Sequence, residues 1–146
     1  MGLQEELKFP NSFASKSHEA MLNIVFTGTL LLREGTRLLR PFGITDTQFN
    51  ILMLLKYQSE DGRINQTTLG NMLLVHRSNI TGIIERMEKI DIVKRVADPE
   101  DRRINYIGMT NKGKEIFEEA HKVYFQRLDE IMSAISKSDN RNYRIY

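Results

Sequence analysis

The side chains best suited to recognising a DNA sequence gather in residues 77–89. Arginine can donate hydrogen bonds to guanine, asparagine can pair with adenine, and serine or threonine can contact bases or phosphates. On a helical wheel, four apolar residues converge on one side, which would be buried: Ile80, Ile83, Ile84 and Met87. The opposite side and the N-terminal end carry Arg77, Ser78, Asn79, Thr81, Gly82, Glu85 and Lys89. This pattern is typical of a helix that enters the major groove, although the wheel alone fits a solvated surface helix equally well.

A basic connector follows, between two segments that predict short β-strands, residues 92–96 and 104–109. The cations around it are Lys94, Arg95, Arg102 and Arg103. Proline and aspartate in the connector favour a turn, so we expect a hairpin whose loop reaches DNA phosphates or the minor groove. Alternatively, the acidic residues neutralise the arginines and stiffen the loop. We expect Asp98 and Asp101 to be structural, with Arg102 or Arg103 on DNA.

Two further groups of residues are candidates for binding. Thr67 and Arg86 are possible DNA contacts, although Arg86 is better placed to brace a wing aspartate than to read a base. Four aromatic residues could line a cleft for a small ligand: Tyr57, His121, Tyr124 and Phe125. Aromatic side chains on helices more often belong to a core or an interface, and that alternative stays open. The four methionines Met21, Met53, Met72 and Met87 are most simply core residues.

Composition excludes several other classes of protein. The chain has 146 residues, no cysteine, and three histidines, no two of which stand at metal-ligand spacing, so we expect no metal site and no cofactor. No nucleophile–base pair, phosphate loop or paired-carboxylate site argues for an enzyme. The net charge is only +2, so DNA binding requires a local basic patch. The N-terminus does not resemble a signal peptide and no apolar run is long enough to span a membrane, so we expect a cytoplasmic protein.

The elements that would position these residues follow one another without internal repeats. Helical spacing predicts a long helix over residues 13–40, too long for the core of a small domain alone. Thr45 and Gln48 form a capping-box pattern at the start of a second helix, and Asn65 is suited to cap a short one. The helix over 77–90, the hairpin and a long last helix capped by Thr110 complete the chain. The predicted fold is mainly α with a small β-hairpin wing (α+β), a winged helix-turn-helix flanked by long helices.

Four stretches resemble the MarR (multiple antibiotic resistance regulator) family. They are the run from Thr45 to Leu55, the run from Leu69 to Lys89, the wing motif Asp-x-x-Asp-x-Arg at Asp98, Asp101 and Arg103, and Met109-Thr-Asn-Lys-Gly. The resemblance covers about residues 20–135. Three features depart from it: His76 stands where a Ser or Thr usually caps the recognition helix, Asp91 replaces a frequent Gly, and the tail lacks a long apolar final helix.

The resemblance implies a homodimer that binds double-stranded DNA. It implies a single domain over residues 1–146, with dimerisation helices at 12–42 and 110–146 around a DNA-binding region at 44–109. It further implies repression at palindromic operators and release by a small phenolic or anionic effector. The alternative is a winged-helix interaction or dimerisation module without DNA binding.

Overall fold

The computed structural model describes residues 3–59, 61–73, 77–98, 101 and 104–138. The chain forms two compact units, Met1–Arg37 and Leu38–Tyr146, each described here by itself. The first holds the short helix α1 (Leu3–Glu6) and nearly all of the long helix α2 (Lys16–Leu39). None of the helices in these ranges is both long and apolar enough to cross a membrane.

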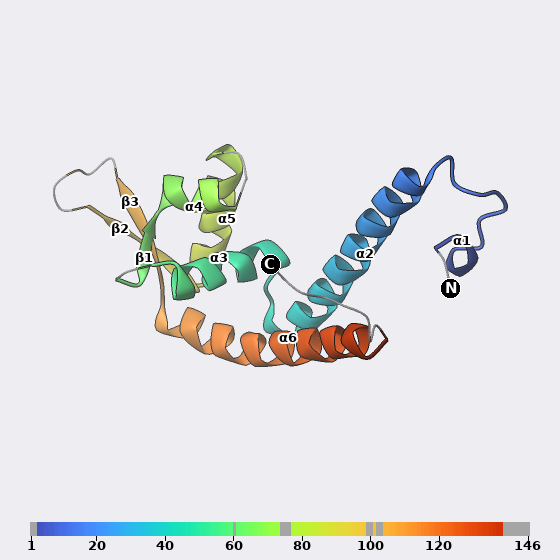
Figure 1. Ribbon diagram of the computed structural model, residues 1–146. Coiled ribbons are helices and arrows are strands. Elements are labelled where there is room, and N and C mark those ends of the chain that lie inside the picture. The colour runs from blue at the N-terminus through green and yellow to red at the C-terminus, as the bar shows by residue number, and fades with distance from the viewer. Residues whose placement is uncertain (1–2, 60, 74–76, 99–100, 102–103, 139–146) are drawn as a thin grey trace. The chain divides into compact units, whose positions relative to one another are not determined.

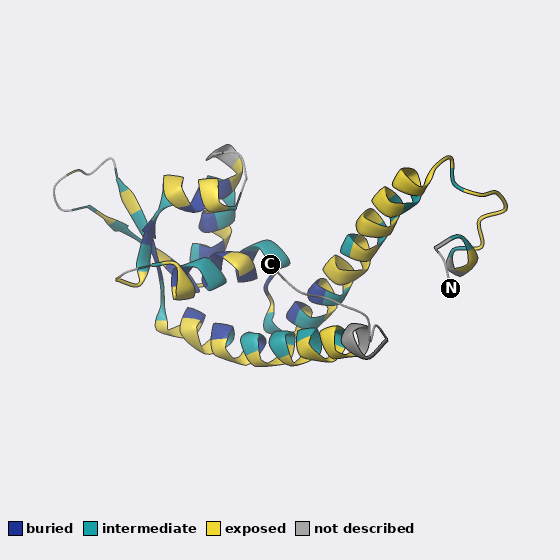
Figure 2. Cartoon of the chain, viewed as in Figure 1, coloured by how far each residue is buried: buried dark blue, intermediate teal, exposed yellow. Residues whose placement is uncertain are grey.

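Helix α2 begins three residues later than its periodicity predicts, and most of its length is exposed (Figure 2). Its exposed side chains include large apolar ones: Met21, Ile24, Val25, Leu30, Leu31 and Leu32. The expectation that Met21 and Met72 belong to the core is wrong, since they are 53% and 45% exposed, whereas Met87 is buried and Met53 packs against the core. A methionine's apolar character does not reveal whether its helix face meets the core.

The second unit contains the predicted winged helix (Figure 1). Its elements are the 3-10 helix η1 (Arg40–Phe42), α3 (Asp46–Tyr57), β1 (Arg63–Asn65), α4 (Gln66–Met72), α5 (Arg77–Lys89), β2 (Val93–Ala97), β3 (Asn105–Met109) and α6 (Asn111–Ser138). The predicted fold class is confirmed. The wing differs in one respect: β1 joins the hairpin, giving an antiparallel sheet of order β1-β3-β2.

Local capping residues begin the helices where the sequence predicts. Thr45 accepts a hydrogen bond from the Gln48 backbone, and the Gln48 side chain accepts one from the Thr45 backbone, which completes the capping box of α3. The Asn65 side chain accepts from the backbone N–H groups of Thr67 and Thr68 at the start of α4. Asp91 takes the left-handed conformation (φ 59°) that ends α5, as a substitute for glycine must.

Buried aliphatic and aromatic side chains of the helices and strands form one core. It includes Leu39, Phe49, Ile51, Leu52, Leu55, Leu69, Ile80, Ile84, Met87, Ile92, Ile107, Phe117 and Ala120. The start of α6 is fastened to the turn between α5 and β2. The Thr110 hydroxyl donates to the Asp91 carbonyl at 2.6 Å and accepts from the Gly113 backbone at 3.0 Å. These bonds fix the first turn of α6 against the end of α5.

We expect Gly113→Ala to destabilise the protein strongly. A Cβ at Gly113 would lie 2.0 Å from the Ile92 carbonyl oxygen, so that α6 would have to move away from the end of α5. Overpacking against rigid atoms costs about 1–3 kcal/mol, and backbone overlap belongs at the upper end. Chemical denaturation measures the loss. The exposed Glu119→Ala on the same helix is the control and should stay within about 0.5 kcal/mol of wild type; an equally small change for Gly113→Ala would contradict the close approach.

Candidate DNA-binding surface

Helix α5 is anchored by its apolar stripe and leaves other residues accessible. Ile80, Ile84 and Met87 are fully buried, whereas Asn79 is exposed. Helix α4 packs closely on α5 at Gly70, where an added Cβ would come into van der Waals contact with a methyl group of Ile80 at 3.4 Å. A short helix packed on a second one, with a polar face left outward, is the geometry that the wheel indicates for a major-groove helix.

The predicted contacts on α5 lie in different surroundings. Arg77 and Ser78 occupy its first turn. Thr81 and Gly82 are half-buried, and Arg86 is exposed, with a guanidinium nitrogen 3.5 Å from where a Cβ on Gly82 would be. Arg86 therefore lies back over Gly82. Thr67 is exposed in the first turn of α4, and its backbone N–H donates to the Asn65 side chain at 2.8 Å.

A polar network joins α4, α5 and the wing. The Gln66 amide donates to the Thr81 hydroxyl at 3.0 Å, and its oxygen accepts from Arg95 Nε at 3.2 Å. The Arg95 backbone N–H donates to Glu88 Oε1 at 3.1 Å, and the Arg95 guanidinium forms an ion pair with Glu88 Oε2. Arg95, predicted to contact DNA, is therefore engaged within the protein. No local sequence pattern points to Gln66 or Glu88 as partners of Arg95, because they lie 29 and 7 positions away from it in the chain.

The register of the sheet assigns Lys94 and Arg95 to opposite faces. Ile64, Ile107 and Arg95 form one cross-strand row, and Arg95 reaches α5 from it. Arg63, Gly108 and Lys94 form the next row. Since successive residues of a strand alternate between faces, Lys94 lies on the face away from α5.

The base of the wing connector is closed by hydrogen bonds. The Asp98 N–H donates to the Ile104 carbonyl at 3.0 Å, and the Ile104 N–H donates to the Asp101 carbonyl at 2.9 Å. The Asp98 carboxylate accepts from the Asp101 N–H at 3.0 Å. Asp98 thus orders the connector through the backbone. Arg102, Arg103 and His76 lie outside the described residues.

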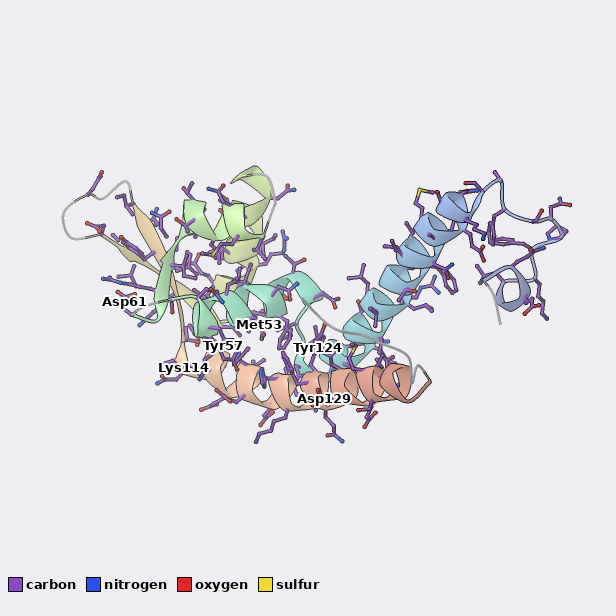
Figure 3. All side chains as sticks on the ribbon, in the orientation of Figure 1. Met53, Tyr57, Asp61, Lys114, Tyr124 and Asp129 are labelled. Atoms are coloured by element: carbon purple, nitrogen blue, oxygen red, sulfur yellow. The ribbon has the colours of Figure 1, made fainter. Side chains whose placement is uncertain are left out.

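The four predicted ligand residues, one on α3 and three on α6, lie together, and Figure 3 labels Tyr57 and Tyr124 among them. The Tyr57 hydroxyl is 3.0 Å from His121 Nε2, and the His121 ring stacks on Phe125 with centroids 4.3 Å apart. Tyr124 packs against the core, with its ring centroid 4.9 Å from that of Phe49. The structure therefore brings these residues into one aromatic cluster, in which Tyr57 is exposed and Tyr124 is partly a core residue.

Helices α4 and α5, with β1 before them and the β2–β3 hairpin after them in one antiparallel sheet, define a winged helix-turn-helix protein. The sequence model of the MarR family matches residues 44–104. The HTH-type transcriptional regulator FarR of Neisseria gonorrhoeae is 29% identical over 125 residues, 84% of each chain. Further curated relatives match over 51–65% of their own length.

Solved structures agree with these matches. The transcriptional regulator Tm0710 of Thermotoga maritima is 30% identical, with a TM-score of 0.57 over 83% of this chain and 82% of that one. NadR in complex with 4-hydroxyphenylacetate is 25% identical, with a TM-score of 0.68 over 89% of each chain. The chain belongs to the MarR family, a family of DNA-binding transcriptional regulators and not of enzymes.

Proposed function

We propose that this chain is a cytoplasmic, homodimeric repressor that binds palindromic operator DNA and releases it when a small phenolic or anionic effector binds. The observation that carries the proposal is helix α5, whose buried stripe holds it to the body while Asn79 stays exposed near its N-terminus. In the proposed dimer, residues 12–42 and 110–146 associate and residues 44–109 contact DNA. Two symmetric α5 helices would then enter successive major grooves about 34 Å apart.

The proposed DNA contacts fall into two groups. On α4 and α5 they are Thr67, Arg77, Ser78, Asn79, Thr81, Gly82 and Arg86, and at the wing they are Arg102 and Arg103. Asn79, which has an exposed amide, is suited to adenine, and wing arginines are suited to phosphates or the minor groove. Because Arg95 is engaged by Glu88 and Gln66, we assign it to holding the wing instead of contacting DNA.

The effector would contact the aromatic cluster of Tyr57, His121, Tyr124 and Phe125. The Tyr57 hydroxyl and the His121 ring supply hydrogen-bonding groups beside aromatic surface, which suits a phenol or an aromatic carboxylate. NadR was crystallised with such a compound, 4-hydroxyphenylacetate. This compound is therefore the first probe for release of DNA.

Selection of bound duplexes from a random pool tests the function as a whole. We expect an inverted repeat with half-sites about ten base pairs apart, since this spacing places both α5 helices on one side of the duplex. If each subunit neutralises about four phosphates, the logarithm of affinity should fall with the logarithm of salt concentration with a slope of about −7. No enriched sequence together with a slope near zero would overturn the proposal and favour the interaction module.

We expect Asn79→Ala to relax the operator sequence. If the amide pairs with an adenine, its loss should cost about 1–3 kcal/mol on the operator and little on non-specific DNA. Titration of both duplexes by fluorescence anisotropy gives the two values. Asn50→Ala removes an exposed amide from α3 instead and is the matched control. An equal loss on both duplexes would show that Asn79 does not read a base.

A further inference from the structure

A basic cleft lies on the face of the sheet that does not meet α5. Its volume is about 380 Å³, within the usual range for small-ligand sites. It is bounded by the end of α3, the turn before β1, the cross-strand row of Arg63, Gly108 and Lys94, and the first turn of α6. The charged residues along it are Lys56, Asp61, Arg63, Lys94 and Lys114. Figure 3 labels Asp61 and Lys114, which come from the β1 turn and from α6.

The cleft is therefore lined by four cationic side chains and one carboxylate, and only two of the cations form ion pairs. Lys56 donates to Glu118 at 3.0 Å, and Arg63 donates to Asp61 at 2.7 Å. The hydrogen bond from Arg63 holds the pKa of Asp61 below its usual value, so Asp61 remains ionised and committed to Arg63. Within the described ranges, the ammonium groups of Lys94 and Lys114 have neither a carboxylate nor another hydrogen-bond partner.

The sheet surface that forms the floor of the cleft has no side chain at its middle position, which leaves space for an anion. Arg63, Gly108 and Lys94 are cross-strand neighbours on β1, β3 and β2, and the middle position has no side chain. With strands about 4.8 Å apart, the Cα atoms of Arg63 and Lys94 lie roughly 10 Å from one another across that glycine. A Cβ at Gly108 would lie 3.4 Å from the Gly62 carbonyl oxygen and would occupy part of this gap.

We propose that this cleft binds a small anion, carrying a phosphate or carboxylate group, between Lys94 and Lys114. The anion would supply the negative charge that these two lysines lack. The site lies on the face of the sheet away from α5, because Arg95, on the opposite side of the same strand, reaches α5. Lys94, which the sequence predicts as a DNA contact, lines this cleft, and we propose the anion as its partner instead. The binding does not depend on the function proposed above.

Titration of the full chain with inorganic phosphate, pyrophosphate and acetate tests the site, with ionic strength held constant by chloride. We expect saturable changes in the backbone amide NMR signals of Gly62 and Gly108 with at least one of these probes. A lysine–anion hydrogen bond is worth about 1.5 kcal/mol or more, so Lys94→Gln/Lys114→Gln should weaken binding about tenfold or more. Lys122→Gln, an exposed lysine on α6 outside the cleft, should leave binding unchanged.

Three outcomes would overturn the proposal. Changes that fail to saturate with every probe would show general ion screening, and an equal loss with Lys122→Gln would show an effect of net charge. The third outcome would show that the lysines bind the phosphates of DNA. If Lys94→Gln/Lys114→Gln lowers the salt slope of DNA binding by about 0.9 for each lysine, these lysines serve the duplex and not a free anion.

Discussion

Glu88→Ala is expected to weaken operator binding, although it removes a negative charge from the DNA-binding unit. Glu88 holds Arg95 through the backbone and through an ion pair, and Gln66 connects Arg95 to Thr81 on α5. Without Glu88 the wing strand loses its direct polar link to the recognition helix and keeps only the connection through Gln66. The pair is about one-quarter to one-third exposed, so the cost is well below that of a fully buried pair. We expect about fivefold to tenfold weaker binding, from a loss of about 1–1.4 kcal/mol.

The sign of the effect separates two roles for Arg95. If Arg95 contacted a phosphate, Glu88→Ala would release it and strengthen binding, and Arg95→Ala would lower the salt slope by about 0.9 per subunit. If Arg95 positions the wing, both variants weaken binding and leave the slope unchanged. Affinity measured at four or more salt concentrations gives both quantities.

Glu85→Ala is the matched control for this experiment. Glu85 lies one turn earlier on α5, is exposed, and carries the same charge. Its removal should leave binding unchanged or strengthen it, because a negative charge is withdrawn from a surface that meets phosphates. Equal weakening by Glu85→Ala and Glu88→Ala would mean that the network does not position the wing.

Ile24→Glu/Leu32→Glu is expected to abolish operator binding by separating the proposed dimer. Ile24 and Leu32 are 74% and 64% exposed, and with Met21, Val25 and Leu31 they form one stripe along α2. Single exposed apolar residues are ordinary, but a continuous stripe marks an interaction surface. Burying each such side chain against a partner contributes about 1.5–3 kcal/mol, and a charge there reverses the gain.

Sedimentation equilibrium measures the association, and the same samples are tested on operator DNA. We expect a monomer at micromolar concentration and binding weakened more than about a hundredfold, since each monomer would hold only one half-site. Asn23→Glu introduces one of the same charges on the other side of α2 and should leave the dimer intact. A double variant that remains dimeric would place the interface elsewhere and would contradict the proposed role of residues 12–42.

Much of the fold could be predicted because helix caps and helical periodicity depend on residues only three or four positions apart in the chain. The capping box of Thr45 and Gln48, the Asn65 cap and the left-handed Asp91 are each defined by near neighbours in the chain. The buried stripe of α5 follows from the helical repeat in the same way. The family resemblance drew on the sequences of the second helix and of residues 69–89 together with the wing motif, and the family match over residues 44–104 agrees with it.

The surroundings of individual site residues depended on pairings between distant parts of the chain. Consecutive strand residues must point to opposite faces, so Lys94 and Arg95 could not share a surface, but the sequence does not say which face meets α5. That choice depends on β1 pairing with β3 across more than 40 positions and on α4 and α5 covering one side of the sheet. Local spacing determined the elements of this protein; only the tertiary register decided that Arg95 meets Glu88 and Gln66 while Lys94 lies along the opposite cleft.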